Sequence, residues 1–251
     1  MLTIYKASLI VIVALTLLYV FQDYYIDFLA FFSNILAPII AGVAVIVSGF
    51  SLQKYWHKAG ERFSMVWLFF TIGLFLWFVG EAIWMGYVLI LGVEIPYPSV
   101  ADVFWLSGYV PFFVALYLYV KLFGAALSKK TLAISMITTL ILTLLVSGTL
   151  INPIIGVEED LTTLIVDFAY PLFDLALFSV SFIGLLIFLK GNLGKSWLLI
   201  NAGILSNVAG DVLFSYTTTQ EIYYSGHLLE LLFLFGYIFF LLAPYVHTME
   251  L

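Results

Sequence analysis

The sequence predicts an all-α membrane protein, a bundle of eight transmembrane helices arranged as two parallel four-helix repeats. Three observations favour this class. The 251 residues are 64% hydrophobic and 10% charged, which is more apolar than an ordinary water-soluble domain. The apolar residues fall into eight stretches, each near the roughly 20 residues that a helix needs to cross a bilayer. The lysines and arginines gather in alternate loops between these stretches.

The eight apolar stretches are the expected helices, because backbone groups in lipid must find hydrogen-bond partners within their own segment. The first one resembles a signal peptide, but the FQDYYIDF that follows it lacks the small residues of a cleavage site, so we expect an uncleaved helix. The sequence contains no cysteine, which excludes disulfides and thiol chemistry. The expected helices are 5–22, 28–53, 62–91, 101–123, 130–151, 161–190, 195–217 and 226–247.

Basic and acidic residues are expected in loops on opposite sides of the membrane. With a cytoplasmic N-terminus, every lysine and arginine falls on the inner side, and the outer loops hold only acids. Because positive residues concentrate in cytoplasmic loops, we predict a multi-pass protein of the cell membrane with both termini in the cytoplasm. The inner bases are Lys6, Lys54, Lys58, Arg62, Lys121, Lys129, Lys130, Lys190 and Lys195; the outer acids are Asp23, Asp27, Glu94, Glu158, Glu159 and Asp160.

An internal repeat relates residues 1–125 to residues 126–251. Glu81 matches Asp211, and Asp102 matches Glu230. Four helices per repeat is an even number, so the two copies would have the same orientation, related by an axis along the membrane normal. Further matches are Gly108-Tyr109 with Gly236-Tyr237, and Asn34 with Asp167, each four residues before a proline.

Ionisable residues inside apolar segments are the candidate ligand-binding residues, because placing a charge in lipid is costly and usually functional. Their helix spacing puts Asp167, Tyr170 and Asp174 on one face. For Asp102, spaced like a capping residue with Ser99, a plain structural role is the stronger interpretation. The same holds for Glu230 and Asp167. The candidate set is Glu81, Asp167, Tyr170, Asp174, Asn207 and Asp211, with Asp102, His227 and Glu230 at the outer rim.

No lysine or arginine lies at the depth of these acids. Three interpretations stay open: the carboxyls carry protons, they bind a metal or organic cation, or they line a water-filled funnel. We expect Glu81 and Asp211 at the same depth, across a shared acidic pocket that opens outward. Asp174 would make the pocket lopsided, because Ala41 stands at its matched position.

Other chemistries find little support. The three histidines, His57, His227 and His247, lie too far apart for paired haem ligation, and the sequence has no HExxH motif. The seventh helix has no lysine at mid-depth for a retinal Schiff base. We therefore assign no catalytic residue, no metal ligands and no cofactor, and we expect no nucleic-acid partner.

Four stretches resemble the multi-helix membrane region found at the N-terminus of many bacterial signalling proteins with GGDEF, EAL or histidine kinase domains. They are GEAIW, PYPSVADVFWLSGY, AYPLFDLAL and GDVLF…YYSGHLLELLFLFGY. In that family the region is thought to sense a stimulus, and an output domain follows. This sequence ends four residues after His247, so the resemblance implies sensing with a separate cytoplasmic or membrane signalling partner. A fainter likeness, AGDVLF…GHLL, points to lysoplasmalogenase-like proteins.

The sequence thus favours a membrane sensor or receptor-like module with an outward-facing acidic pocket for a small molecule or cation. A proton- or cation-coupled transporter is the first alternative, in which the same carboxyls bind the coupling ion. An intramembrane hydrolase is the second alternative, although a metal-dependent hydrolase usually has histidine ligands beside the acids.

Overall fold

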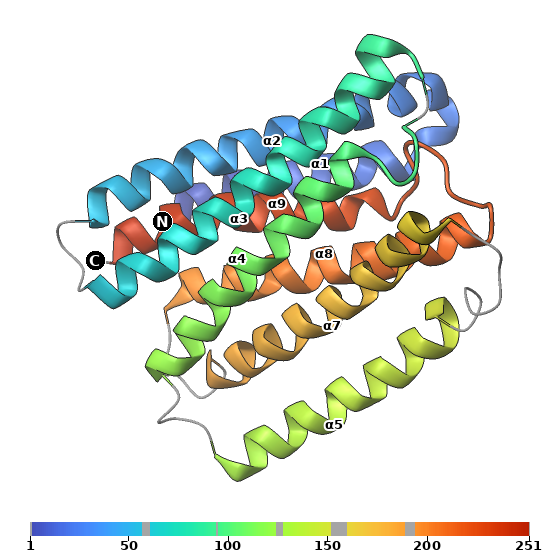
Figure 1. Ribbon diagram of the computed structural model, residues 1–251. Coiled ribbons are helices and arrows are strands. Elements are labelled where there is room, and N and C mark those ends of the chain that lie inside the picture. Colours follow the sequence, from blue (N-terminus) through green and yellow to red (C-terminus); the bar gives the residue numbers. More distant parts are fainter. Residues whose placement is uncertain are drawn as a thin grey trace.

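The computed structural model describes residues 2–56, 61–93, 95–123, 128–151, 160–188 and 194–250. All regular elements in these ranges are helical, and eight of the helices are long and apolar enough to cross a membrane, as the sequence predicts (Figure 1). They are α1 (Leu2–Val20), α2 (Ile26–Tyr55), α3 (Glu61–Met85), α4 (Val100–Phe123), α5 (Lys129–Val146), α7 (Leu161–Phe188), α8 (Lys195–Thr219) and α9 (Glu230–Glu250).

Short helical turns extend two of these helices and join two others. A π-helical turn, η2 (Gly86–Leu91), continues α3, and another, η4 (Ser147–Ile151), continues α5. The 3-10 turn η1 (Gln22–Tyr24) joins α1 to α2. The last helix begins at Glu230 rather than at residue 226 as expected, because Gly226 adopts a φ of +91°, which is outside the helical region.

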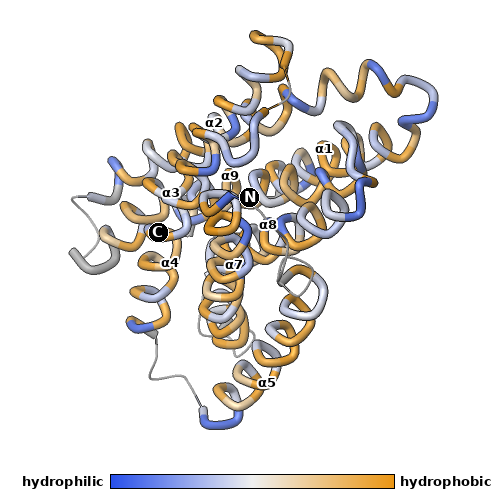
Figure 2. Tube along the Cα trace, turned by 45° about the vertical axis from the view of Figure 1, so that its right-hand side comes forward, coloured by the Kyte–Doolittle hydropathy of each residue, from blue (hydrophilic) through white to orange (hydrophobic). Residues whose placement is uncertain are grey.

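Six of the helices form a closed ring. Contacts run from α2 to α3, α4, α7, α8 and α9 in turn, and α9 packs back against α2. The other two helices lie outside the ring, with α5 against α7 and α1 against α9 (Figure 1). In Figure 2 the colour of hydrophobic residues recurs along every labelled helix. Many large hydrophobic side chains are exposed on the outside of the bundle, as expected of a surface that faces lipid.

The bundle has two chemically different ends. The end formed by the α1–α2, α3–α4, α5–α7 and α8–α9 connections is called the acidic end here, because its described charged side chains include Asp23, Asp27, Asp160 and Glu221. The opposite end holds both chain termini (Figure 1) and the described bases Lys6, Lys54, Lys121, Lys129, Lys130 and Lys195; it is called the basic end. Lys58, Lys190, Glu94, Glu158, Glu159 and the side chain of Arg62 lie outside the described residues.

Large aromatic side chains fill the centre of the ring. Phe112 of α4 stacks on Phe240 of α9 with ring centroids 5.5 Å apart. Toward the basic end, Trp197 of α8 stacks on Tyr119 of α4 at 3.4 Å and lies 5.6 Å from Trp67 of α3. These buried rings belong to one continuous hydrophobic core. The middle and basic parts of the bundle are therefore packed mainly with apolar and aromatic groups, between which a few polar side chains such as Ser48, Ser181 and Asn201 are buried.

Two glycines set the distance between neighbouring helices. A Cβ built on Gly108 of α4 would lie against Trp77 and 3.2 Å from the Gly73 carbonyl oxygen of α3. A Cβ built on Gly236 of α9 would lie against Asn207 and 3.2 Å from the Gly203 carbonyl oxygen of α8. Only glycine allows this approach of the two backbones, as is common where membrane helices cross closely.

Candidate functional site

Five carboxyl side chains in the half of the bundle nearer the acidic end share one feature: each accepts a hydrogen bond from a tyrosine hydroxyl. All five lie on ring helices, one each on α3, α4, α7, α8 and α9. We call them, with their tyrosine partners, the carboxyl–tyrosine cluster. The pairs are Glu81 with Tyr237, Asp102 with Tyr170, Asp174 and Asp211 with Tyr109, and Glu230 with Tyr19 and Tyr223.

The centre of the cluster is Tyr109 of α4, which lies between two acids. Its hydroxyl oxygen is 2.7 Å from Oδ1 of Asp174 on α7 and 2.9 Å from Oδ2 of Asp211 on α8. A tyrosine hydroxyl has one hydrogen to donate. If both carboxyls were ionised, one of these two contacts would lack a hydrogen. The arrangement is therefore suited to hold one additional proton or another positively charged donor.

A simpler pair lies on the other side of the ring. Tyr237 of α9 donates its hydroxyl hydrogen to Oε1 of Glu81 on α3 at 2.8 Å. Ala41 of α2, which the sequence matches to Asp174, is fully buried and apolar. This side therefore has one carboxyl for one tyrosine, whereas the Tyr109 side has two.

Asp102 has both a structural and a cluster role. Its Oδ2 accepts hydrogen bonds from the Ser99 backbone N–H and hydroxyl at 2.7 and 2.9 Å, and the Ser99 hydroxyl oxygen accepts from the Ala101 N–H at 3.1 Å. This reciprocal pattern at the start of α4 is a relative of the capping box, in which the Ser99 side chain accepts from the second rather than the third helical N–H, and the spacing of Ser99 and Asp102 predicts it. Oδ1 of Asp102 accepts from Tyr170 of α7 at 2.8 Å, so the capping residue also joins α4 to α7.

Glu230, the first residue of α9, accepts three hydrogen bonds from residues outside that helix. Its Oε1 accepts from the Tyr223 hydroxyl at 2.9 Å and from the Gly226 N–H at 2.8 Å, and its Oε2 accepts from Tyr19 of α1 at 2.9 Å. Burial, and the neighbouring negative charge of Glu230, raise the pKa of Tyr223 well above its usual value. Glu230 thus ties α1 and the α8–α9 connection to the ring.

Three residues of the predicted set lie outside the cluster, although Asp167 makes the same kind of hydrogen bond. Asn207 is buried at the α8–α9 crossing, where its amide nitrogen donates to the Gly203 carbonyl at 2.9 Å. Asp167 lies nearer the acidic end and accepts a hydrogen bond from Tyr97. The ring of His227 lies beside Tyr224, and its Nδ1 accepts from the Leu229 N–H at 3.2 Å. These contacts give all three residues local structural roles.

Among the hydrogen bonds described for the cluster, the partners of the carboxyls are hydroxyl and backbone N–H groups. In the described part of the chain, no group of three or more His, Asp or Glu residues is arranged to hold a metal ion. Asp102 and Asp174 are buried, whereas Glu81, Asp211 and Glu230 keep partial exposure. Two surface cavities lie elsewhere, beside the basic half of α2.

Tyr109 and Tyr237 are the hydrogen-bond donors of the cluster that residue-by-residue reading of the sequence misses. The helix face shared with Asp167 and Asp174 predicts Tyr170, whereas Tyr109 and Tyr237 stand out in the sequence only as matched positions of the expected repeat. The sequence does contain a signal for these two tyrosines, because Gly108-Tyr109 and Gly236-Tyr237 stand at matched positions in the two halves. A recurring tyrosine in a segment whose acids lack bases is a natural hydrogen donor to them.

Comparisons of the chain with protein-family models, with curated proteins and with solved structures found no match.

Proposed function

We propose that this chain is an integral membrane sensor or receptor-like module of the cell membrane, with both termini in the cytoplasm. The carboxyl–tyrosine cluster would be its input site, entered from outside at the acidic end, and a separate partner would receive the signal. The observation that carries this proposal is the placement of five carboxyls, without a described basic partner, in one half of an apolar bundle. Such placement is costly and is usually retained for function.

We also infer that the bundle consists of two parallel repeats, residues 1–125 and 126–251, related by an axis along the membrane normal. Contacts between the halves support the duplication because they occur in matched pairs. Tyr109 bonds to Asp211 as Tyr237 bonds to Glu81. The neighbour pairs in the ring are matched too: α2–α3 with α7–α8, α3–α4 with α8–α9, and α4–α7 with α9–α2.

Two further matched contacts support the same inference. Trp67 stacks on His247 with ring centroids 4.7 Å apart, as Trp197 stacks on Tyr119. The Ser48 hydroxyl lies 2.7 Å from that of Thr71 on α3. At the matched place, the Ser181 hydroxyl donates to the side-chain oxygen of Asn201 on α8 at 2.9 Å.

The packing of the other half favours a sensor over a transporter. A transporter of this size must let its substrate reach both sides in turn. The described core between the cluster and the basic end contains stacked rings, among them Phe112, Phe240, Trp67 and Trp197. A cation that leaves the cluster toward the basic end would therefore meet closely packed rings, and the polar groups described there are already paired, Ser48 with Thr71 and Ser181 with Asn201. The extra carboxyl, Asp174, would draw the ligand toward α7 and α8.

A proton- or cation-coupled transporter is the second candidate. The observation that favours it is the Tyr109 hydroxyl, which faces two carboxyls and so can exchange a proton between them. The two candidates differ in one measurable property, because a transporter moves its ion across the membrane and a sensor only binds it.

Reconstituted liposomes provide the test. The purified chain is inserted with the acidic end outward, and a trapped pH dye reports proton flux while tryptophan fluorescence reports conformation. The Trp77 indole N–H donates to the Trp105 carbonyl next to the cluster, so the fluorescence of these indoles should respond to binding there. After an external change of pH or addition of sodium or magnesium, we expect a fluorescence change without sustained flux.

The matched variants are Asp211→Asn in the cluster and Asp27→Asn, an exposed acid at the same end. The first should reduce the fluorescence change and the second should preserve it. Sustained flux that needs Asp211 would instead establish the transporter. A fluorescence change equally insensitive to both variants would remove the cluster as the input site.

A further inference from the structure

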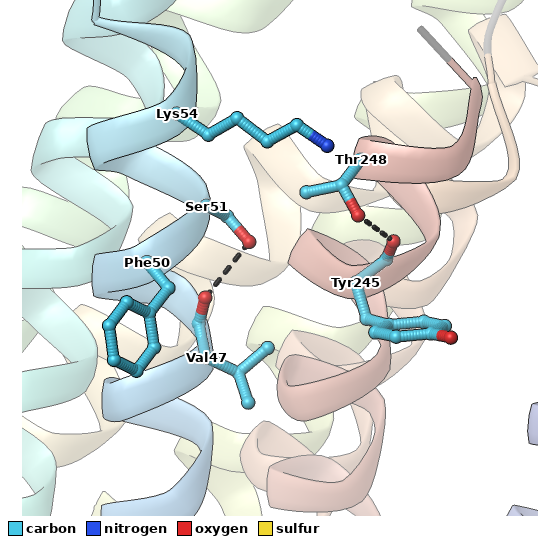
Figure 3. A pocket seen from close by; sticks show the side chains of 6 residues that line it. All are labelled: Val47, Phe50, Ser51, Lys54, Tyr245 and Thr248. Carbon is cyan, nitrogen blue, oxygen red and sulfur yellow. Dashed lines mark hydrogen bonds between the residues drawn. The ribbon is translucent and has the colours of Figure 1, made fainter.

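A groove at the basic end of the bundle lies between α2 and α9, far from the carboxyl–tyrosine cluster. Its volume is about 230 Å³, and it is lined by Val47, Phe50, Ser51, Lys54, Tyr245 and Thr248 (Figure 3). Phe50 is 69% exposed, and Ile46 and Val43 on the same helix are exposed as well. In a membrane this face of α2 meets lipid, so a lipid molecule is the natural occupant of the groove.

The groove lining changes from apolar to polar along α2. Val47 and Phe50 come first, then Ser51, and Lys54 stands at the end of the span. In Figure 3 the Lys54 side chain extends across the mouth of the groove toward Thr248. Trp56, half-exposed, follows within two residues, as is typical of the boundary between hydrocarbon and headgroups. A phospholipid has the same apolar-to-polar order, with acyl chains toward the middle of the membrane and a phosphate toward its surface.

The charges at this site favour an anionic headgroup. Lys54 is the one charged residue among the described residues that line the groove. The Ser51 hydroxyl donates to the Val47 carbonyl at 2.9 Å, and the Thr248 hydroxyl donates to the Tyr245 carbonyl at 2.7 Å. These two hydroxyls have thus used their hydrogens, and the Lys54 ammonium is the positively charged donor that the described lining offers to a phosphate.

A second cavity on α2 provides an internal comparison. It has a volume of about 270 Å³ and is lined by Gly49, Leu52, Gln53 and Trp56. It lies in the same stretch of α2, but its described lining includes no charged residue. Any lipid there would be held by shape, by apolar contact and by the neutral polar groups of Gln53 and Trp56, without a charge. The α2–α9 groove differs from it chiefly by Lys54.

We propose that the α2–α9 groove binds one anionic phospholipid, with an acyl chain against Val47 and Phe50 and the headgroup phosphate on Lys54. Basic pockets between transmembrane helices are suited to such headgroups. The occupant is a bilayer lipid and not a soluble anion, because half of the recognition surface is apolar and faces hydrocarbon.

Native mass spectrometry of the full chain in a neutral detergent tests this site. Phosphatidylglycerol and phosphatidylcholine with identical acyl chains are added in turn. We expect one phosphatidylglycerol to be retained in preference to phosphatidylcholine. Lys54→Gln should weaken its retention on the order of five-fold, the attraction expected of one lysine near an anionic surface. Val47→Phe, which fills the apolar part, should weaken the retention of both lipids.

Lys121→Gln is the matched control, because Lys121 lies at the same end but on α4, over the Tyr117 ring. It should leave the preference unchanged. Equal retention of the two lipids by the parent chain would overturn the proposal. So would an equal loss in Lys54→Gln and Lys121→Gln, which would indicate net charge, and so would displacement of the lipid by glycerol phosphate alone.

Discussion

The Tyr109 hydroxyl of α4 lies 2.7 Å from the Asp174 carboxyl of α7, although 65 residues separate them in the chain. The same hydroxyl reaches Asp211 at 2.9 Å. This tyrosine therefore joins three ring helices at one point. Removal of its hydroxyl would leave two carboxyls in an apolar bundle without their common donor.

Tyr109→Phe should therefore lower the free energy of unfolding by about 1–3 kcal/mol, the usual cost of leaving a buried polar group without its partner. Thermal unfolding in detergent is the measurement. Tyr117→Phe, on the exposed face of the same helix, is the control and should change little. Adding Asp211→Asn to Tyr109→Phe should recover part of the loss, because the amide can donate a hydrogen bond to Asp174. No recovery would argue against the shared-donor arrangement.

Gly108→Ala and Gly236→Ala should each destabilise the bundle by about 1–3 kcal/mol, since the added methyl would press on the neighbouring helix and its side chains. Gly49→Ala is the matched control. A Cβ at Gly49 would meet open space, and alanine is favoured in a helix by about 0.5–1 kcal/mol. Equal effects of the three substitutions on thermal unfolding would contradict the close helix crossings.

The orientation can be checked by labelling single cysteines, because the chain has no native cysteine. Cysteines at Asp23 and Asp160, at the acidic end, should react with a membrane-impermeant maleimide added to intact cells. Cysteines at Lys54, Lys129 and Lys195 should react only after permeabilisation. If both groups react from one side, the spans do not alternate as the charge distribution implies.

Alkaline pH should act through Tyr223. The pKa of Tyr223 is raised in the folded chain, so its neutral form is favoured by folding. This contribution is complete below the unfolded value of about 10, and it is lost as the pH rises toward the folded value. Above pH 10 the stability should fall by up to about 1.4 kcal/mol per pH unit for this one group.

Tyr223→Phe keeps the ring contact with Phe214, whose centroid lies 4.7 Å away, but it has no proton to lose. Its unfolding temperature should therefore fall less steeply above pH 10 than that of the parent chain. Parallel curves for the two proteins would show that Tyr223 titrates alike in both states.

The helices and the capping box were predictable from sequence because both depend on neighbours in the chain. Apolar runs of sufficient length mark the spans, and Ser99 stands three residues before Asp102. The side-chain pairs were less accessible. Nothing local connects Glu81 with Tyr237, which are 156 residues apart. The matched positions of Gly108-Tyr109 and Gly236-Tyr237 in the predicted repeat are an indirect signal for these tyrosines.

Asn207 shows that residues on one polar helix face can have different surroundings. Its spacing from Asp211 suggests a shared polar face, yet Asn207 lies at the close crossing with Gly236, and its amide bonds within its own helix. A polar stripe on a helix can serve a ligand site at one level and helix packing one turn away. The sequence does not separate these roles, because they depend on how near the next backbone comes.

The closed ring has a consequence for biogenesis. Because α2 packs against α9, the ring closes only when the last span has entered the membrane. Until then, Glu81 lacks its hydrogen bond from Tyr237, and Tyr19 of the first span lacks its hydrogen bond to Glu230. A nascent chain that lacks α9 would expose these unpaired groups to the bilayer. Such exposure gives cellular quality control a way to distinguish incomplete chains from finished ones.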